Sequence, residues 1–207
     1  MSRSNNPVIV VTGFGPYQKF SKNPSERLTR RLGEQGLDTS ETYTLITEII
    51  PVTYNDVNQT VSKLWRTYNP DLMIHIGASP SPKVINLEQQ SFRRGYETYD
   101  MNAQLPAGQV CPQCGECEDV DTLVSGLNCE KIAEAVSKEL PQSIIECKVS
   151  HDPGRYLCAY IYFISLSYNK DKTLFIHVPD FDKTTEDVVF DSLKRIIKQC
   201  LTQIKKK

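Results

Sequence analysis

The sequence lacks two features that would assign it to large functional classes. It contains no run of the roughly 20 apolar residues that a membrane-spanning helix needs. Its charges nearly balance, with 24 Lys and Arg against 25 Asp and Glu, so no charge excess indicates binding to nucleic acid or to an anionic membrane surface. We therefore expect neither nucleic acid nor a membrane among its partners.

A signal for secretion is also missing. The first residues, MSRSNNPVIVVTGF, contain only a short apolar run before glycine and proline follow, unlike the apolar core of a signal peptide. The seven cysteines are an odd number, and without a secretory signal they are expected to be free thiols in a reducing compartment. The sequence thus predicts a cytoplasmic protein, and we expect a monomer or a weak homo-oligomer.

Nucleotide-binding motifs are absent as well. The segment TGFGP, residues 12–16, has neither the third glycine of a dinucleotide fingerprint nor the Gly-Lys-Ser/Thr of a phosphate loop. The bulky side chains of Phe14 and Tyr17 favour an apolar lip over a small ligand, although ordinary turn residues would give the same pattern.

Short β-rich runs alternate with helical patterns along the chain. Strands are predicted at 7–14, 42–50, 71–77, 83–88, 143–150 and 173–179, and helices at 23–36, 55–69, 129–140, 156–168 and 185–204. Strands separated by helices require crossover connections. We therefore predict one α/β/α domain over residues 1–207, with a largely parallel, twisted sheet of about six strands and helices on both faces. Ligands of such sheets bind beyond the carboxyl ends of the strands.

One segment interrupts this alternation. Residues from about 89 to 127 are irregular and rich in Gly, Pro, Cys and charge, and so long a loop in a compact domain is usually functional or disordered. Within it, the spacing of Cys111, Cys114 and Cys117 suits a soft metal, but a structural zinc site needs four ligands and no Cys or His follows closely. A solvated lid of free thiols is therefore favoured over a metal site.

The three histidines fall at different places in this pattern. His75 lies inside a buried strand, which favours a packed, hydrogen-bonded core side chain. His177 comes directly before its strand is broken by Val-Pro, and therefore at the carboxyl edge of the sheet. His151 begins the loop that leads to Cys158, but short loops seldom align two side chains seven residues apart. Edge position favours His177 over His151 as a catalytic base.

Cys158 is the candidate nucleophile. It follows a Pro-Gly turn and opens a helix, where unpaired N–H groups and the helix dipole favour a thiolate. Taken alone, it is better explained as a small packed side chain, because free cysteine is commonly buried. Glu88 ends the predicted strand 83–88, where its carboxylate can orient an imidazole, but taken alone it is a surface glutamate.

Taken together, these residues resemble the pyroglutamyl-peptidase I family of cysteine peptidases. The resemblance extends nearly end to end, through VVTGFGPY, IPVTYNDV, LMIHIGAS, NLE, GRYLC and FIHVP, and the cysteine-bearing loop is similar to that of the animal branch. It implies a hydrolase that removes the N-terminal pyroglutamyl residue from small peptides and requires no metal or organic cofactor. It also implies that Cys158 is the nucleophile, His177 the base and Glu88 the acidic third member.

The chemistry of the substrate is consistent with these residues. A pyroglutamyl residue is a neutral five-membered lactam without a free amine, so its pocket must be small and apolar with a few polar groups. Phe14 and Tyr17 are expected to face the ring, and Asn23 or nearby backbone to contact its polar atoms. Where bacterial members usually have Gly-Gln-Ala-Gly, residues 77–80 are Gly-Ala-Ser-Pro. A thiol hydrolase of another small amide or lactam, or a non-catalytic peptide- or metal-binding relative, is therefore the alternative.

Overall fold

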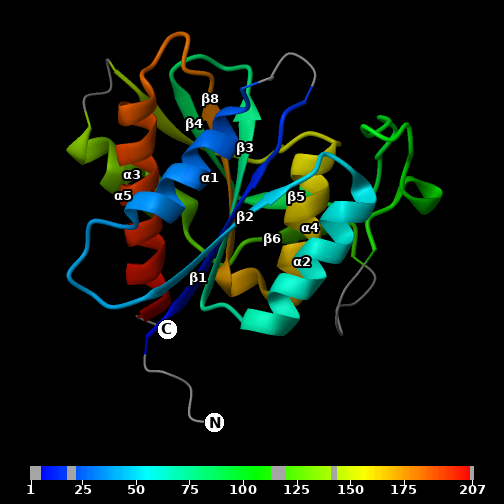
Figure 1. The fold of residues 1–207 in the computed structure, drawn as a ribbon, viewed down its shortest axis with the longest axis horizontal. Helices are drawn as coiled ribbons and strands as arrows, with labels where there is room; N and C mark the ends of the chain where they lie inside the picture. The colour runs from blue at the N-terminus through cyan, green and yellow to red at the C-terminus, as the bar shows by residue number, and fades with distance from the viewer. Residues whose placement is uncertain (1–5, 18–21, 113–119, 141–143, 206–207) are drawn as a thin grey trace.

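A six-stranded sheet forms the centre of the molecule (Figure 1). The structure is a computed structural model that describes residues 6–17, 22–112, 120–140 and 144–205. In spatial order the strands are β2 (Thr44–Ile50), β1 (Val8–Phe14), β3 (Leu72–Ser79), β8 (Thr173–Pro179), β4 (Val84–Glu88) and β7 (Glu146–Ser150). Neighbouring strands are parallel except β8 and β4, which are antiparallel. The predicted six-stranded, largely parallel sheet is confirmed.

Helices cover both faces of the sheet, as Figure 1 shows. On one face lie α1 (Pro24–Gln35), α3 (Cys129–Glu139) and α5 (Glu186–Lys205), and on the other α2 (Tyr54–Tyr68) and α4 (Leu157–Asn169). A short 3₁₀ segment, η2 (Lys170–Lys172), joins α4 to β8. Each face has its own hydrophobic core, which confirms the three-layer α/β/α prediction.

The helix α4 is the most deeply buried helix on its face. Ten of its residues are buried and these lie on most sides of the helix, because α4 packs against the sheet, α2 and β5 (Gln90–Phe92) at once. A helix enclosed in this way has little freedom to shift relative to the sheet. Its first turn, which contains Cys158, is therefore held in a fixed position at one end of the sheet.

The described parts of the segment 89–127, residues 89–112 and 120–127, contain more regular structure than predicted. The strand β5 pairs with β6 (Thr122–Val124) in a small antiparallel sheet, and a 3₁₀ turn, η1 (Ala107–Gln109), lies between them in sequence. Cys111 is fully buried, with its Sγ 3.5 Å from the carbonyl oxygen of Tyr160. The prediction of a solvated thiol is wrong for Cys111, because its side chain belongs to the core on the α4 side of the sheet. Cys114 and Cys117 lie outside the described residues.

The burial of Cys111 leads to a test of stability. We expect Cys111→Ser to lower the free energy of unfolding by about 1–3 kcal/mol, because it places a hydroxyl group in an apolar core. Ala107→Ser is the matched control, since Ala107 is exposed in the same segment and surface changes stay within about ±0.5 kcal/mol. Denaturant unfolding of both variants measures the difference. Equal stability of Cys111→Ser and wild type would contradict the buried position.

Candidate active site

The antiparallel contact between β4 and β8 brings Glu88 and His177 together. His177 is paired with Asn86, and Glu88 is paired with Phe175, so Glu88 and His177 are diagonal neighbours on one face of the sheet. The Nδ1–H of His177 donates to Oε1 of Glu88 over 2.7 Å. Because β4 is antiparallel to β8, Glu88 at the carboxyl end of β4 is paired with Phe175, near the amino end of β8. In an all-parallel sheet the carboxyl ends of the two strands would instead lie at the same edge.

Glu88 is a buried carboxylate with few partners. Its residue is 1% exposed, and among the described residues its Oε2 has no hydrogen-bond partner. Its backbone carbonyl accepts a hydrogen bond of 2.7 Å from the hydroxyl of Tyr162. Since a buried charge needs compensation, Glu88 depends on a positive charge at His177.

Cys158 is the second residue of α4 and is half-buried. It lies close enough to His177 to raise the pKa of that ring, and because Nδ1 of the ring is bonded to Glu88, Nε2 is the nitrogen left for the thiol. Tyr162 stands four residues after Cys158 and therefore on the same side of α4. One face of α4 thus presents the thiol to His177 and holds the backbone at Glu88.

The electrostatics of His177 favour the charged imidazole. Burial lowers the pKa of His177, but the charge and hydrogen bond of Cys158, followed by the hydrogen bond and charge of Glu88, outweigh burial and raise the pKa from 6.5 to about 10. At neutral pH the ring of His177 is therefore a charged imidazolium that lies between the side chains of Cys158 and Glu88. An imidazolium can donate a proton to a leaving group, and a thiolate is the nucleophilic form of cysteine.

The contribution of Glu88 can be measured through pH dependence. Because Glu88 raises the pKa of His177, we expect Glu88→Gln to move the alkaline limb of the kcat/KM profile to lower pH. The charged ring of His177 also adds to the free energy of unfolding. Because folding raises its pKa from 6.5 to about 10, this contribution is complete below about pH 6.5 and is lost as pH rises through 10. Activity should fall between wild type and His177→Ala. An alkaline limb at the wild-type pH would contradict this role.

Gly77 allows the thiol to approach the sheet. Gly77 is paired with His177 across β3 and β8, and a Cβ on Gly77 would lie 2.9 Å from Sγ of Cys158 and 2.6 Å from the ring of Phe175. The ring of Phe175 in turn packs against the imidazole of His177, with centroids 4.7 Å apart. The absence of a side chain at Gly77 therefore leaves the space in which Sγ of Cys158 lies, next to the strand that carries His177.

This close approach predicts a large effect from one methyl group. We expect Gly77→Ala to lower kcat by at least about tenfold, because Cys158 and Phe175 must move by tenths of an ångström or more and misalign the thiol with His177. Gly15→Ala is the control, since a Cβ there meets nothing closer than 3.9 Å. Steady-state kinetics with thermal unfolding separate misalignment from loss of fold, and an unchanged kcat would contradict the steric argument.

The other two histidines lie outside this constellation. His151 is exposed, and no described contact joins its ring to Cys158. His75 is fully buried, with Nδ1 at 2.7 Å from the hydroxyl of Thr12 and Nε2 at 2.6 Å from that of Ser165. Burial lowers the pKa of His75 to about 3, so its ring is neutral. The prediction of a packed, hydrogen-bonded core histidine is confirmed for His75.

Comparison with known proteins supplies the family. The family model described as "Putative pyroglutamyl peptidase PgaPase_1" matches residues 2–182. Pyroglutamyl-peptidase 1 of Mus musculus is 31% identical over 196 residues, which cover 93% of this chain and 89% of the mouse protein. The chain belongs to the pyroglutamyl-peptidase family.

Solved structures of this family show the same fold. Pyrrolidone carboxyl peptidase from Thermococcus litoralis superposes with a TM-score of 0.77 over 97% of this chain and 96% of its own, at 19% identity. The corresponding protein from Pyrococcus furiosus gives a TM-score of 0.80 over 95% and 99%, at 20% identity. Family members therefore share this three-layer architecture over nearly their whole length.

The predicted apolar lip of this family member lies beside α4. Phe14 is 5% exposed at the end of β1. The ring of Tyr17 lies 5.5 Å from that of Tyr156, and Tyr156 is also in edge contact with Tyr54, at 6.0 Å. Sequence reasoning missed Tyr156, although its place two residues before Cys158 was the available signal. These rings belong to the same core cluster as Cys158, and their role as a lip over a ligand stays a prediction.

Asn23 has mainly local partners. It is 4% exposed, its side-chain amide donates to the carbonyl of Gly15 over 2.8 Å, and its Oδ1 accepts from the backbone N–H of Ser25 as the N-cap of α1. These bonds fix the segment that carries Phe14. The predicted contact of Asn23 with substrate stays a prediction; among the described residues, its second amide hydrogen has no hydrogen-bond partner.

The segment 77–80 continues β3 and then turns. Gly77, Ala78 and Ser79 are strand residues, and the hydroxyl of Ser79 accepts from the backbone N–H of Ser81 over 3.2 Å. Position 78 thus offers no side-chain amide to a ligand.

No group of three or more Cys, His, Asp or Glu among the described residues is arranged to bind a metal ion. No helix of the described chain is long and apolar enough to cross a membrane.

Proposed function

We propose that this protein is a cysteine peptidase that hydrolytically removes the N-terminal pyroglutamyl residue from small peptides. The observation that supports the proposal most strongly is the chain of contacts from Glu88 through His177 to Cys158. The resemblance to pyroglutamyl-peptidase 1 in both sequence and fold gives the substrate class. In this proposal the whole chain, residues 1–207, is one catalytic domain.

The first half of the reaction forms a thioester. The thiolate of Cys158 attacks the carbonyl carbon that joins pyroglutamate to the next residue, and negative charge develops on the carbonyl oxygen. Backbone N–H groups of the first turn of α4 are proposed to stabilise this oxygen, since the N-cap residue Tyr156 gives them no side-chain hydrogen bond. The amide C–N bond then breaks, and the imidazolium of His177 gives its proton to the leaving amine.

The second half regenerates the enzyme. Neutral His177 accepts a proton from a water molecule, whose oxygen attacks the thioester carbonyl and displaces the thiolate of Cys158. Pyroglutamate is released, and the thiolate–imidazolium pair is restored. Throughout, the bond from Nδ1 of His177 to Glu88 holds the ring with Nε2 toward the thiol.

The aromatic group beside Cys158 is proposed to bind the lactam ring. Phe14, Tyr17 and Tyr156 give the apolar surface that a neutral ring without a free amine requires.

A reducing environment follows from the same chemistry. The proposed nucleophile is a half-buried free cysteine, and oxidants convert the thiolate that attacks the substrate to sulfenic acid or a disulfide. We therefore propose that the enzyme works in the cytoplasm. We also propose that it is a monomer or a weak homo-oligomer.

Hydrolysis of a fluorogenic pyroglutamyl amide tests the proposed function. The purified protein is expected to release the fluorophore from the pyroglutamyl amide and not from the matched proline and glutamine amides. The proline amide controls for ring size and the glutamine amide for the open form of the lactam. Hydrolysis of the proline or glutamine amide at a comparable rate would instead favour a hydrolase of other small amides.

A further inference from the structure

Two large apolar side chains on one loop are unusually exposed. In the segment 95–105, here called the rim loop, Tyr99 is 62% exposed and Met101 is 56% exposed. These are the highest values among the exposed large hydrophobic residues of the described chain. Exposed apolar side chains that lie close together often mark a binding surface.

The rim loop is firmly anchored, so this exposure does not come from a loose backbone. Asp100, between the two residues, is 7% exposed, and its carboxylate accepts hydrogen bonds from the backbone N–H groups of Tyr54, Asn102 and Gln104 at 2.9 Å each. The backbone N–H of Met101 donates to the carbonyl of Val52 over 3.2 Å. The start of α2 thus fixes the loop in a shape that presents Tyr99 and Met101 outward.

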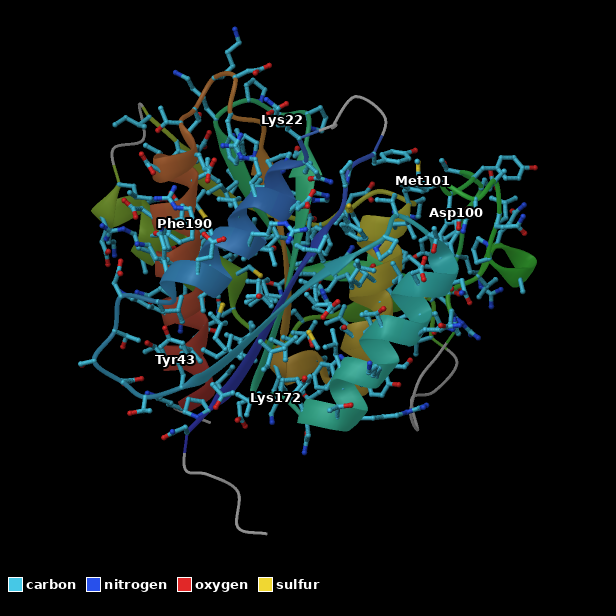
Figure 2. The ribbon with its side chains drawn as sticks, viewed as in Figure 1. Lys22, Tyr43, Asp100, Met101, Lys172 and Phe190 are labelled. Atoms are coloured by element: carbon cyan, nitrogen blue, oxygen red, sulfur yellow. The ribbon has the colours of Figure 1, made fainter. Side chains whose placement is uncertain are left out.

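The same loop touches the candidate active site. The hydroxyl of Tyr156, two residues before Cys158, donates to the carbonyl of Tyr99 over 3.3 Å. Figure 2 shows Met101 at the end of the molecule where α4 begins. Because the loop contacts the N-cap residue of the helix that carries Cys158, the residue directly after the scissile bond is the part of the leaving peptide that starts nearest to the loop.

We propose that the rim loop binds the peptide on the leaving side of the scissile bond, and that Tyr99 and Met101 favour an apolar side chain there. This inference rests on the proposed function and names its substrate class: pyroglutamyl peptides with an apolar residue directly after the pyroglutamate. The backbone of the rim loop is already fixed, so the loop can cover an apolar side chain of the substrate without the entropy cost of ordering the loop.

A hollow on the same side of the molecule offers the peptide a different place to bind. A cavity of about 530 Å³ lies between α2 and the segment 100–112, lined by both polar side chains, such as Asn58 and Gln104, and apolar ones, such as Leu105. Neither Tyr99 nor Met101 lines it. A peptide that entered this cavity would not contact Tyr99 or Met101, so its cleavage would not depend on those two side chains.

Kinetics with two dipeptide amides separate these outcomes. We expect wild type to cleave pyroglutamyl-leucine amide with a kcat/KM about tenfold above that for pyroglutamyl-serine amide. The double variant Tyr99→Ala with Met101→Ala should reduce this ratio to about twofold, mainly by lowering kcat/KM for the leucine substrate. Tyr68→Ala, which removes another exposed aromatic ring at the far end of α2, should keep the wild-type ratio.

Three results would overturn the inference. The first is a serine preference, or no preference, in wild type, and the second is an unchanged ratio in the double variant. The third is a homodimer, seen by sedimentation, that the double variant dissociates, because Tyr99 and Met101 would then form a contact between copies. If the protein hydrolysed neither of the dipeptide amides nor the fluorogenic amide, the proposed function itself would be overturned, and this inference with it.

Discussion

Cys158→Ser is expected to abolish the release of fluorophore from a pyroglutamyl amide while the melting temperature stays close to that of wild type. A serine hydroxyl beside His177 stays protonated at neutral pH, whereas the imidazolium stabilises the thiolate of Cys158. The substitution exchanges one atom of similar size at a half-buried position, so packing in α4 should persist. Initial rates and thermal unfolding of the purified variant measure the two effects.

Alkylation provides an independent measurement of the same thiolate. Loss of activity with a thiol reagent at neutral pH should proceed in step with labelling of Cys158. Cys147 is the matched control, because it is also partly exposed but burial raises the pKa of its thiol to about 12, which keeps it protonated and slow to react. The Cys147→Ala variant should therefore be as active as wild type and should be inactivated by the thiol reagent at the same rate. Full activity of Cys158→Ser, or inactivation without labelling of Cys158, would contradict the mechanism.

The sequence predicted the sheet well, because buried strands and amphipathic helices leave strong local patterns. It did not predict the direction of β4. A strand of five residues reads the same in either direction, and its orientation depends on which neighbour it pairs with far along the chain. The consequence is specific: Glu88 reaches His177 diagonally across an antiparallel pair, although it ends its own strand.

Residues that act through shape were also beyond sequence reasoning. Gly77 could be identified as the end of a strand, but its close approach to Sγ of Cys158 arises only when α4 packs over β3. Tyr162 lies in an almost uniformly apolar helix, where no local pattern distinguishes the tyrosine whose hydroxyl binds the backbone at Glu88. Cys111 was misassigned to solvent because its neighbours in sequence are polar, whereas its neighbours in space are the aromatic and apolar residues of the core on the α4 side.

His177→Ala is expected to lower kcat by a factor of about 10² or more, the range for loss of a general acid–base group. The variant loses both the proton donor for the leaving amine and the positive charge that stabilises the thiolate of Cys158. It also leaves the buried carboxylate of Glu88 without its partner, which can destabilise the fold by about 3–5 kcal/mol. His177→Gln removes that ambiguity, because its amide can still donate to Glu88 but cannot transfer a proton.

His151→Ala is the control that decides between the two histidines. Because His151 is exposed and no described contact joins its ring to the thiol, its loss should change kcat by less than about twofold. The pH profile gives a second criterion: His151→Ala should keep the alkaline limb near pH 10, whereas both His177 variants should lose it, since the imidazolium that titrates there is gone. If His151→Ala were the slower enzyme and His177→Gln kept near wild-type kcat, the base would be His151, and the contact between His177 and Glu88 would be structural.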